Sequence, residues 1–163
     1  MSLPRTQLLL LALLISAHGQ GTPKAAPGPD ALCTYFEAVL REAPAKFAAL
    51  RGKPIEGFTP MWEGKLKAPG ATGCEASEQG YFCSLGFRPD QAKGKREFAA
   101  LGKRARACFP GWTAEDSRDE SAWRFVLARD HTRVSVDYSG LVPSGDEEDE
   151  QPELTLSVYI AGK

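Results

Sequence analysis

The sequence predicts an α+β fold, a two-layer sandwich in which an antiparallel sheet of five or six strands carries two amphipathic helices on one face. Two segments repeat apolar residues at spacings of three and four, which is the period of a helix with one buried side. Several shorter segments alternate apolar and polar residues, as strands with one buried face do. These segments follow in the order α-β-β-β-α-β-β-β, which suits two layers around one core.

The chain begins with a predicted secretory signal peptide over residues 1–19. Arg5 supplies the positive charge, and the unbroken apolar run from Leu8 to Ile15 is far shorter than the roughly 20 residues that span a bilayer. Ala17 and Gly19 are the small residues expected before a cleavage site. The alternative, an uncleaved anchor, is disfavoured by the short run. We therefore expect an exported protein, periplasmic or extracellular, that is soluble after cleavage and has no integral membrane segment.

Residues 20–29 are predicted to form a flexible spacer rich in Pro, Ala and Gly, and residues 30–163 a single disulfide-stapled domain. Removing Arg5 from the 20 basic side chains leaves 19 against 21 acidic ones, a net charge of −2. A weakly acidic chain is not typical of a protein that binds nucleic acid.

The first helix is predicted to begin at Ala31, because the carboxylate of Asp30 suits the N-cap position. Its apolar face consists of Leu32, Phe36, Val39, Leu40, Ala43, Phe47 and Leu50. Pro44 interrupts this face without changing its phase, so we expect a kinked helix or two abutting helices. Gly52 is expected to end the helix.

Three short strands are predicted next. Residues 53–61 contain two prolines and a glycine and are expected to form a connection. The first strand is predicted over Trp62 to Lys67. Gly73 to Ala76 and Tyr81 to Phe87 are predicted to pair as a hairpin.

A second helix is predicted to start at Pro89 and Asp90 and to stop before Pro110 and Gly111. Its apolar stripe, spaced by three, four and three residues, consists of Phe98, Leu101, Ala105 and Cys108.

A second hairpin is predicted around a two-residue turn at Asp130 and His131. This register places three apolar pairs on one side of the sheet: Leu127 with Val134, Phe125 with Val136 and Trp123 with Tyr138. On the other side it pairs Arg124 with Asp137. A last strand is predicted over Glu153 to Ile160, after a solvated acidic loop at residues 146–150.

The four cysteines are expected to form two disulfides, because their number is even and the chain is predicted to be exported. If residues 77–80 form the first hairpin's turn, Cys74 lies opposite Cys83, close enough for a bridge. Cys33 then pairs with Cys108 by elimination. A zinc site is the alternative, but eight residues separate Cys74 from Cys83 and there is no Cys-x-x-Cys pair.

The sequence offers no catalytic, cofactor-binding or metal site that we can name. After the leader, His131 is the only histidine, and a histidine in a tight turn is typical of a solvated surface. The motifs of serine hydrolases, zinc proteases and phosphate-binding loops are missing. A pair of hydrolytic carboxylates leaves no readable spacing, so this class stays open.

Two charged segments are interpreted as solvated surface rather than as sites. The first is the acidic loop, which lacks the ligand spacing of a calcium loop. The second is the polar face of the second helix, which consists of Lys93, Lys95, Arg96, Lys103, Arg104 and Arg106.

These observations predict a small exported binding or interaction module without catalytic chemistry and without a cofactor. Its partner is expected to be a protein of the cell envelope or the extracellular space. One alternative is a secreted inhibitor of a hydrolase such as a lysozyme or a peptidase, presented on residues 53–61 or on the acidic loop. The other is a carboxylate-dependent hydrolase.

Overall fold

The computed structural model describes residues 30–57, 60–140 and 151–161. The predicted signal peptide, the spacer and the acidic loop at residues 146–150 lie outside the described residues. No helix of the described part is long and apolar enough to cross a membrane.

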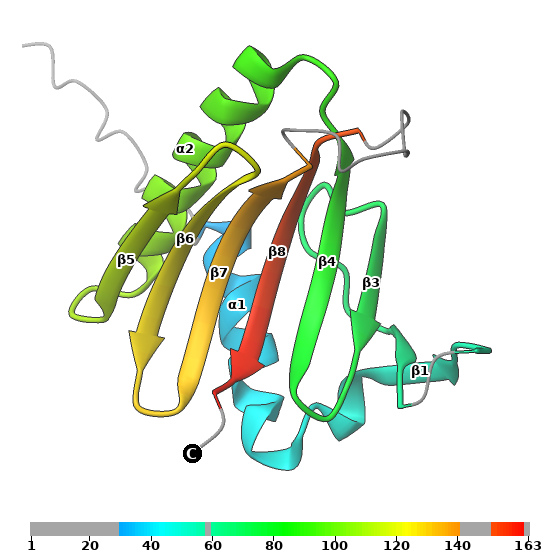
Figure 1. Ribbon diagram of the computed structural model, residues 1–163. Coiled ribbons are helices and arrows are strands. Elements are labelled where there is room, and N and C mark those ends of the chain that lie inside the picture. Colours follow the sequence, from blue (N-terminus) through cyan, green and yellow to red (C-terminus); the bar gives the residue numbers. More distant parts are fainter. Residues whose placement is uncertain (1–29, 58–59, 141–150, 162–163) are drawn as a thin grey trace, which may run out of the picture.

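The described residues form one antiparallel sheet of eight strands with two α-helices (Figure 1). Across the sheet the strand order is β1-β2-β3-β4-β8-β7-β6-β5. The helices are α1 (Ala31–Glu42) and α2 (Gln91–Cys108), and the strands are β1 (Arg51–Pro54), β2 (Trp62–Gly64), β3 (Gly73–Ala76), β4 (Gly80–Phe87), β5 (Thr113–Arg118), β6 (Ala122–Arg129), β7 (Thr132–Ser139) and β8 (Glu153–Ile160).

The prediction of five or six strands in the order α-β-β-β-α-β-β-β is therefore wrong. It missed β1 and β5, which are the two edge strands of the sheet. β1 contains Gly52 and Pro54, and β5 is exposed along almost its whole length, so neither segment alternates apolar and polar residues. Edge strands bury little surface, and the alternation that reveals a strand in the sequence depends on burial.

The first helix also differs from its prediction. α1 ends at Glu42 and is followed by two 3₁₀ turns, η1 (Ala43–Ala45) and η2 (Ala48–Leu50). Between them Lys46 and Phe47 have left-handed backbone angles, φ 52° and 58°. The chain thus turns sharply after Pro44 and still buries Phe47 completely. Gly52, expected to end the helix, lies in β1 instead.

The two hairpin registers are confirmed. Cys74 lies opposite Cys83 in the pair of β3 and β4, and Leu127 lies opposite Val134 in the pair of β6 and β7. Arg124 and Asp137 face each other across β6 and β7 and form an ion pair.

The described residues form two successive α-β-β-β-β units, α1 with β1 to β4 and α2 with β5 to β8. Each unit forms a four-stranded meander, and the two meanders join where β4 pairs antiparallel with β8. Figure 1 shows both helices behind the sheet, where α2 packs on β7 and β6 and α1 packs on β8. The core lies between these helices and the sheet, and its largest fully buried side chains are those of Tyr81, Tyr138, Phe36, Phe47 and Phe98.

Two disulfides staple this arrangement. Cys33 in the first turn of α1 is bonded to Cys108 at the end of α2, with 5.1 Å between their Cα atoms. Cys74 is bonded to Cys83 across the β3–β4 hairpin, with 4.1 Å between the Cα atoms. Next to the first bridge, Asp30 pairs with Arg104 at 2.7 Å, so a covalent and an ionic link join the same helix ends.

Candidate functional site

The face of the sheet opposite the helices, called here the open face, is not covered by any helix of the described residues. Its side chains alternate along each strand with those of the core. Across the four central strands they are Phe82 and Ser84 of β4, Glu153, Thr155, Ser157 and Tyr159 of β8, Arg133, Ser135 and Asp137 of β7, and Arg124, Val126 and Ala128 of β6.

A chain of hydrogen bonds occupies the centre of the open face. Ser135 donates to Asp137 at 2.5 Å and lies 2.6 Å from the hydroxyl of Ser157. A serine hydroxyl has one proton, so Ser157 is the donor to Ser135. On the other side of Asp137, Arg124 donates a hydrogen bond to the same carboxylate. This hydrogen bond raises the pKa of the Arg124 guanidinium. Ser135 and Ser157 are buried, and Arg124 holds the Asp137 carboxylate in an ion pair, so this chain of hydrogen bonds joins the central strands rather than presenting a hydroxyl to a substrate.

A groove of about 460 Å³ opens on the first half of this face, between β2, β3, β4 and β8. It is hollow because the residues along its middle are small: Gly73, Ser84 and Thr155. A Cβ built on Gly73 would meet no atom within 4 Å, so the space above this residue is empty. Apolar side chains contribute to its wall, and one of them, Phe82, is 38% exposed.

The rim of this groove carries three carboxylates and no basic side chain: Glu63, Glu75 and Glu153. We call it the acidic groove. Glu63 and Glu75 lie directly opposite each other in the pair of β2 and β3, and both are exposed. Within the described ranges, neither has an ion-pair partner. Glu153 accepts a hydrogen bond from Ser84.

The floor of the acidic groove is held from the core side by the Cys74–Cys83 disulfide. The hydroxyl of Tyr35, on α1, lies 3.1 Å from the sulfur of Cys83. Burial raises the pKa of the Tyr35 phenol, so this group stays protonated and serves packing rather than acid–base chemistry. The groove therefore lies on a cross-linked and well-packed part of the sheet.

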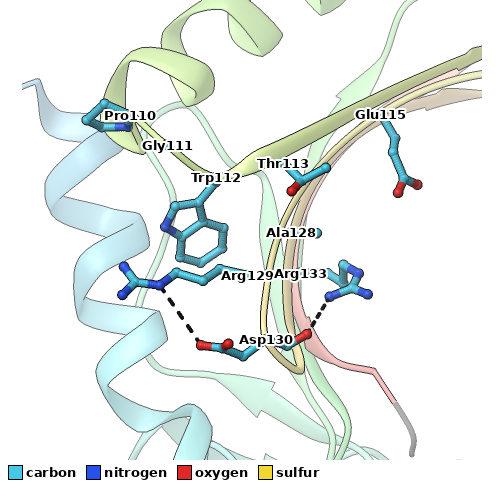
Figure 2. A pocket seen from close by; sticks show the side chains of 9 residues that line it. All are labelled: Pro110, Gly111, Trp112, Thr113, Glu115, Ala128, Arg129, Asp130 and Arg133. Carbon is cyan, nitrogen blue, oxygen red and sulfur yellow. Dashed lines mark hydrogen bonds and ion pairs between the residues drawn. The ribbon is translucent and has the colours of Figure 1, made fainter.

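A second hollow, also of about 460 Å³, lies at the end of β5, β6 and β7 and is shown in Figure 2. Three of its charged side chains, those of Arg129, Asp130 and Arg133, are engaged within the hairpin turn, and the fourth, Glu115, lies on β5. Arg133 donates to the carbonyl oxygens of Asp130 and Thr132 at 3.1 and 3.2 Å, and Arg129 lies 4.0 Å from the carboxylate of Asp130. The indole of Trp112 forms one wall and also packs on Phe109 in the core.

A third and smaller hollow of about 260 Å³ lies between α2 and the sheet. Its floor is apolar, and its two arginines already have carboxylate partners. Arg88 pairs with Glu97 at 2.5 Å, and Arg104 pairs with Asp30. The hydrogen bond from Arg104, together with that from the backbone of Leu32, lowers the pKa of the Asp30 carboxyl. This hollow is therefore a gap in the side-chain packing, and the arginines that line it are already paired with carboxylates.

The structure places the residues singled out in the sequence in separate regions. His131 lies exposed in the β6–β7 turn, where its carbonyl oxygen accepts from the amide of Ala161. On the polar side of α2, Lys95 stacks over the Trp123 ring at 4.9 Å, and Arg104 belongs to the ion pair with Asp30. In the described part of the chain, no group of three His, Cys, Asp or Glu side chains is placed to hold a metal ion.

The sequence reasoning missed the acidic groove. A usable signal was present, because Glu75 and Phe82 occupy the polar positions of the strands that contain Cys74 and Cys83. The missing step was the pairing of β2 with β3, which brings Glu63 beside Glu75.

Comparison of the chain with protein-family models, with curated proteins and with solved structures finds no match. The case for the candidate site therefore rests on its geometry alone.

Proposed function

We propose that the protein is a small exported binding module without catalytic chemistry, and that its partner docks in the acidic groove on the open face of the sheet. The observation that carries the proposal is the groove itself, a hollow with an exposed aromatic side chain and with carboxylates that have no ion-pair partner among the described residues. Two disulfides are compatible with a chain that works outside the cytoplasm. An extracellular or periplasmic protein is the class of partner that this setting favours.

The experiment that tests the proposal fills the groove without disturbing the fold. Gly73 lies in β3 with open space above it, so Gly73→Trp adds a ring where the partner would lie. Ser117→Trp is the matched control, because it adds the same ring to the open face on the exposed edge strand β5, away from the groove. Thermal unfolding of both variants verifies that the sheet is intact.

Each protein is immobilised and exposed to the exported proteins of the source cells. We expect the wild type and Ser117→Trp to retain a common partner that Gly73→Trp loses. Equal retention by all three proteins, or retention of no partner by the wild type, would contradict docking in the groove.

A hydrolase inhibitor is a specific form of this proposal. Ile55, in the segment 53–61 that is the candidate inhibitory segment, lines the acidic groove, and its amide donates to the carbonyl of Met61 at 3.0 Å. Ile55 thus belongs both to this segment and to the wall of the groove. Titration of purified lysozymes and peptidases with the wild type and with Gly73→Trp tests this form, since an inhibitor acting here loses potency in the variant.

A carboxylate-dependent hydrolase is the second candidate, and the facing pair of Glu63 and Glu75 favours it. We place it second because both side chains are exposed, whereas a carboxylic acid catalyst needs burial to keep its proton near neutral pH. Turnover of glycoside and ester substrates that disappears in Glu63→Gln would reverse this order.

A further inference from the structure

The charge of the acidic groove indicates what kind of partner it accepts. Three carboxylates line it, and none of its lining residues is basic. The hollow on the other half of the sheet differs, because Arg129 and Arg133 line it together with Glu115 and Asp130. Carboxylates without basic side chains beside them are thus a property of the groove and not of the open face as a whole.

The facing pair of Glu63 and Glu75 is unfavourable for the isolated protein. Like charges directly opposite each other in an antiparallel pair repel and destabilise the sheet. A cation placed between or above the two carboxylates would remove this repulsion and gain two attractions at once. The pair therefore favours a positively charged occupant more strongly than two separate glutamates would.

The exposed ring of Phe82, beside this pair, further limits which kind of cationic group suits the groove. Phe82 lies directly opposite Glu75 in the pair of β3 and β4, so the aromatic face and the carboxylates line the same hollow. A lysine or arginine side chain suits this combination, because its alkyl stem packs on an aromatic ring while its charged end reaches a carboxylate. A small inorganic cation has no alkyl stem to pack on the ring, so it would use less of this surface.

We infer that the acidic groove binds a segment of a partner polypeptide that presents a lysine or arginine side chain to Glu63 and Glu75. This inference rests on the proposed function and names the chemistry of the partner. The volume of about 460 Å³ is larger than a single basic side chain requires, which leaves room for neighbouring residues of the same segment. Thr155, Ser84 and Gly73 keep the middle of the groove low enough for a peptide backbone.

The test uses the complete oxidised chain and two short capped peptides, one alternating Lys with Ala and one alternating Glu with Ala. Fluorescence anisotropy with labelled peptides measures the affinity of each. We expect only the lysine peptide to bind, and we expect Glu63→Gln combined with Glu75→Gln to weaken it about fivefold, since partly exposed ion pairs each contribute little. Raising the salt from about 0.05 to about 0.5 M should weaken binding to the wild type and change binding to the double variant much less.

The control variant is Glu115→Gln, which removes a carboxylate of the open face outside the groove. It should bind the lysine peptide like the wild type. Equal affinity for both peptides, or an equal loss in Glu115→Gln, would overturn the inference. Spermidine, tested as a competitor, separates a polypeptide site from a general amine site. Displacement by spermidine at concentrations as low as those of the unlabelled peptide would overturn the assignment to a polypeptide.

The inference and the proposed function fail in different ways. If the groove binds a partner of another chemistry, the natural partner is lost by Gly73→Trp but retained by the double glutamine variant. If the groove is not a binding site, Gly73→Trp retains the natural partner as well, and neither peptide binds.

Discussion

The hydroxyl of Tyr138 on β7 lies where a side chain at Gly94 of α2 would begin, so the helix can approach the sheet only because this residue has no Cβ. The same hydroxyl donates to the carbonyl oxygen of Arg88 at 3.1 Å. Desolvation raises the pKa of Tyr138, so the hydroxyl keeps its proton for this hydrogen bond. One side chain thereby fixes both the position of α2 and the segment that leads into it.

Gly94→Ala should destabilise the protein by about 1–3 kcal/mol, because the new methyl group overpacks against the Tyr138 ring. An alanine in a helix is otherwise stabilising, so the sign of the effect is informative. Gly102→Ala in the same helix is the comparison, and it should cost less, since the nearest atom, a ring carbon of Phe125, lies 3.3 Å from the new Cβ and needs to move only a few tenths of an ångström. Urea unfolding of both variants measures the difference. A gain of stability in Gly94→Ala would show that α2 does not pack as described.

The two disulfides should contribute unequally to stability. The Cys33–Cys108 bridge has a sequence separation of 75, and the Cys74–Cys83 bridge one of 9. The chain-entropy model then gives about 4.5 kcal/mol for the first bridge and about 2.5 kcal/mol for the second. Urea unfolding of the two double-serine variants tests this order. A larger loss on removing the hairpin bridge would contradict a dominant effect on the unfolded chain.

The ion pair between Asp30 and Arg104 should make stability depend on pH in the acid range. Because the pKa of Asp30 is lowered below 3.8 in the folded protein, its contribution is complete above 3.8 and is lost as the pH falls through the folded value. Asp30→Asn keeps an N-cap acceptor and removes only the charge. We expect this variant to be less stable than the wild type at pH 7 and equally stable at a pH below the folded value. Asp90→Asn, at the N-cap of α2, serves as the control, because none of the ion pairs among the described residues includes Asp90.

The sequence predicted those elements whose side chains are buried on one side only. The hairpin of β6 and β7 is an example, because Phe125, Leu127 and Val134 fix its register by burial. β5 lacks such a pattern, and its position follows from pairing with β6 alone. The pairing of β4 with β8 at the centre of the sheet joins residues that are distant in the chain, so no local sequence pattern reveals it. One wall of the acidic groove, formed by Glu153 and Thr155, depends on this long-range order, so the local signal from Glu75 and Phe82 was not sufficient to predict the groove.

The facing carboxylates of Glu63 and Glu75 lead to the last prediction, which separates stability from binding. Glu75→Gln removes the repulsion across β2 and β3 and should raise the free energy of unfolding by about 0.2–1 kcal/mol. The same variant should weaken binding of the lysine peptide, because it removes one of the two charges that receive the basic side chain. A residue with a purely structural role would not change these two quantities in opposite directions. Glu115→Gln should change neither, as Glu115 lies opposite the apolar Val126. If Glu75→Gln lowered stability as well as binding, the pair would be a structural element of the sheet, and the acidic groove would lose its electrostatic basis as a binding site.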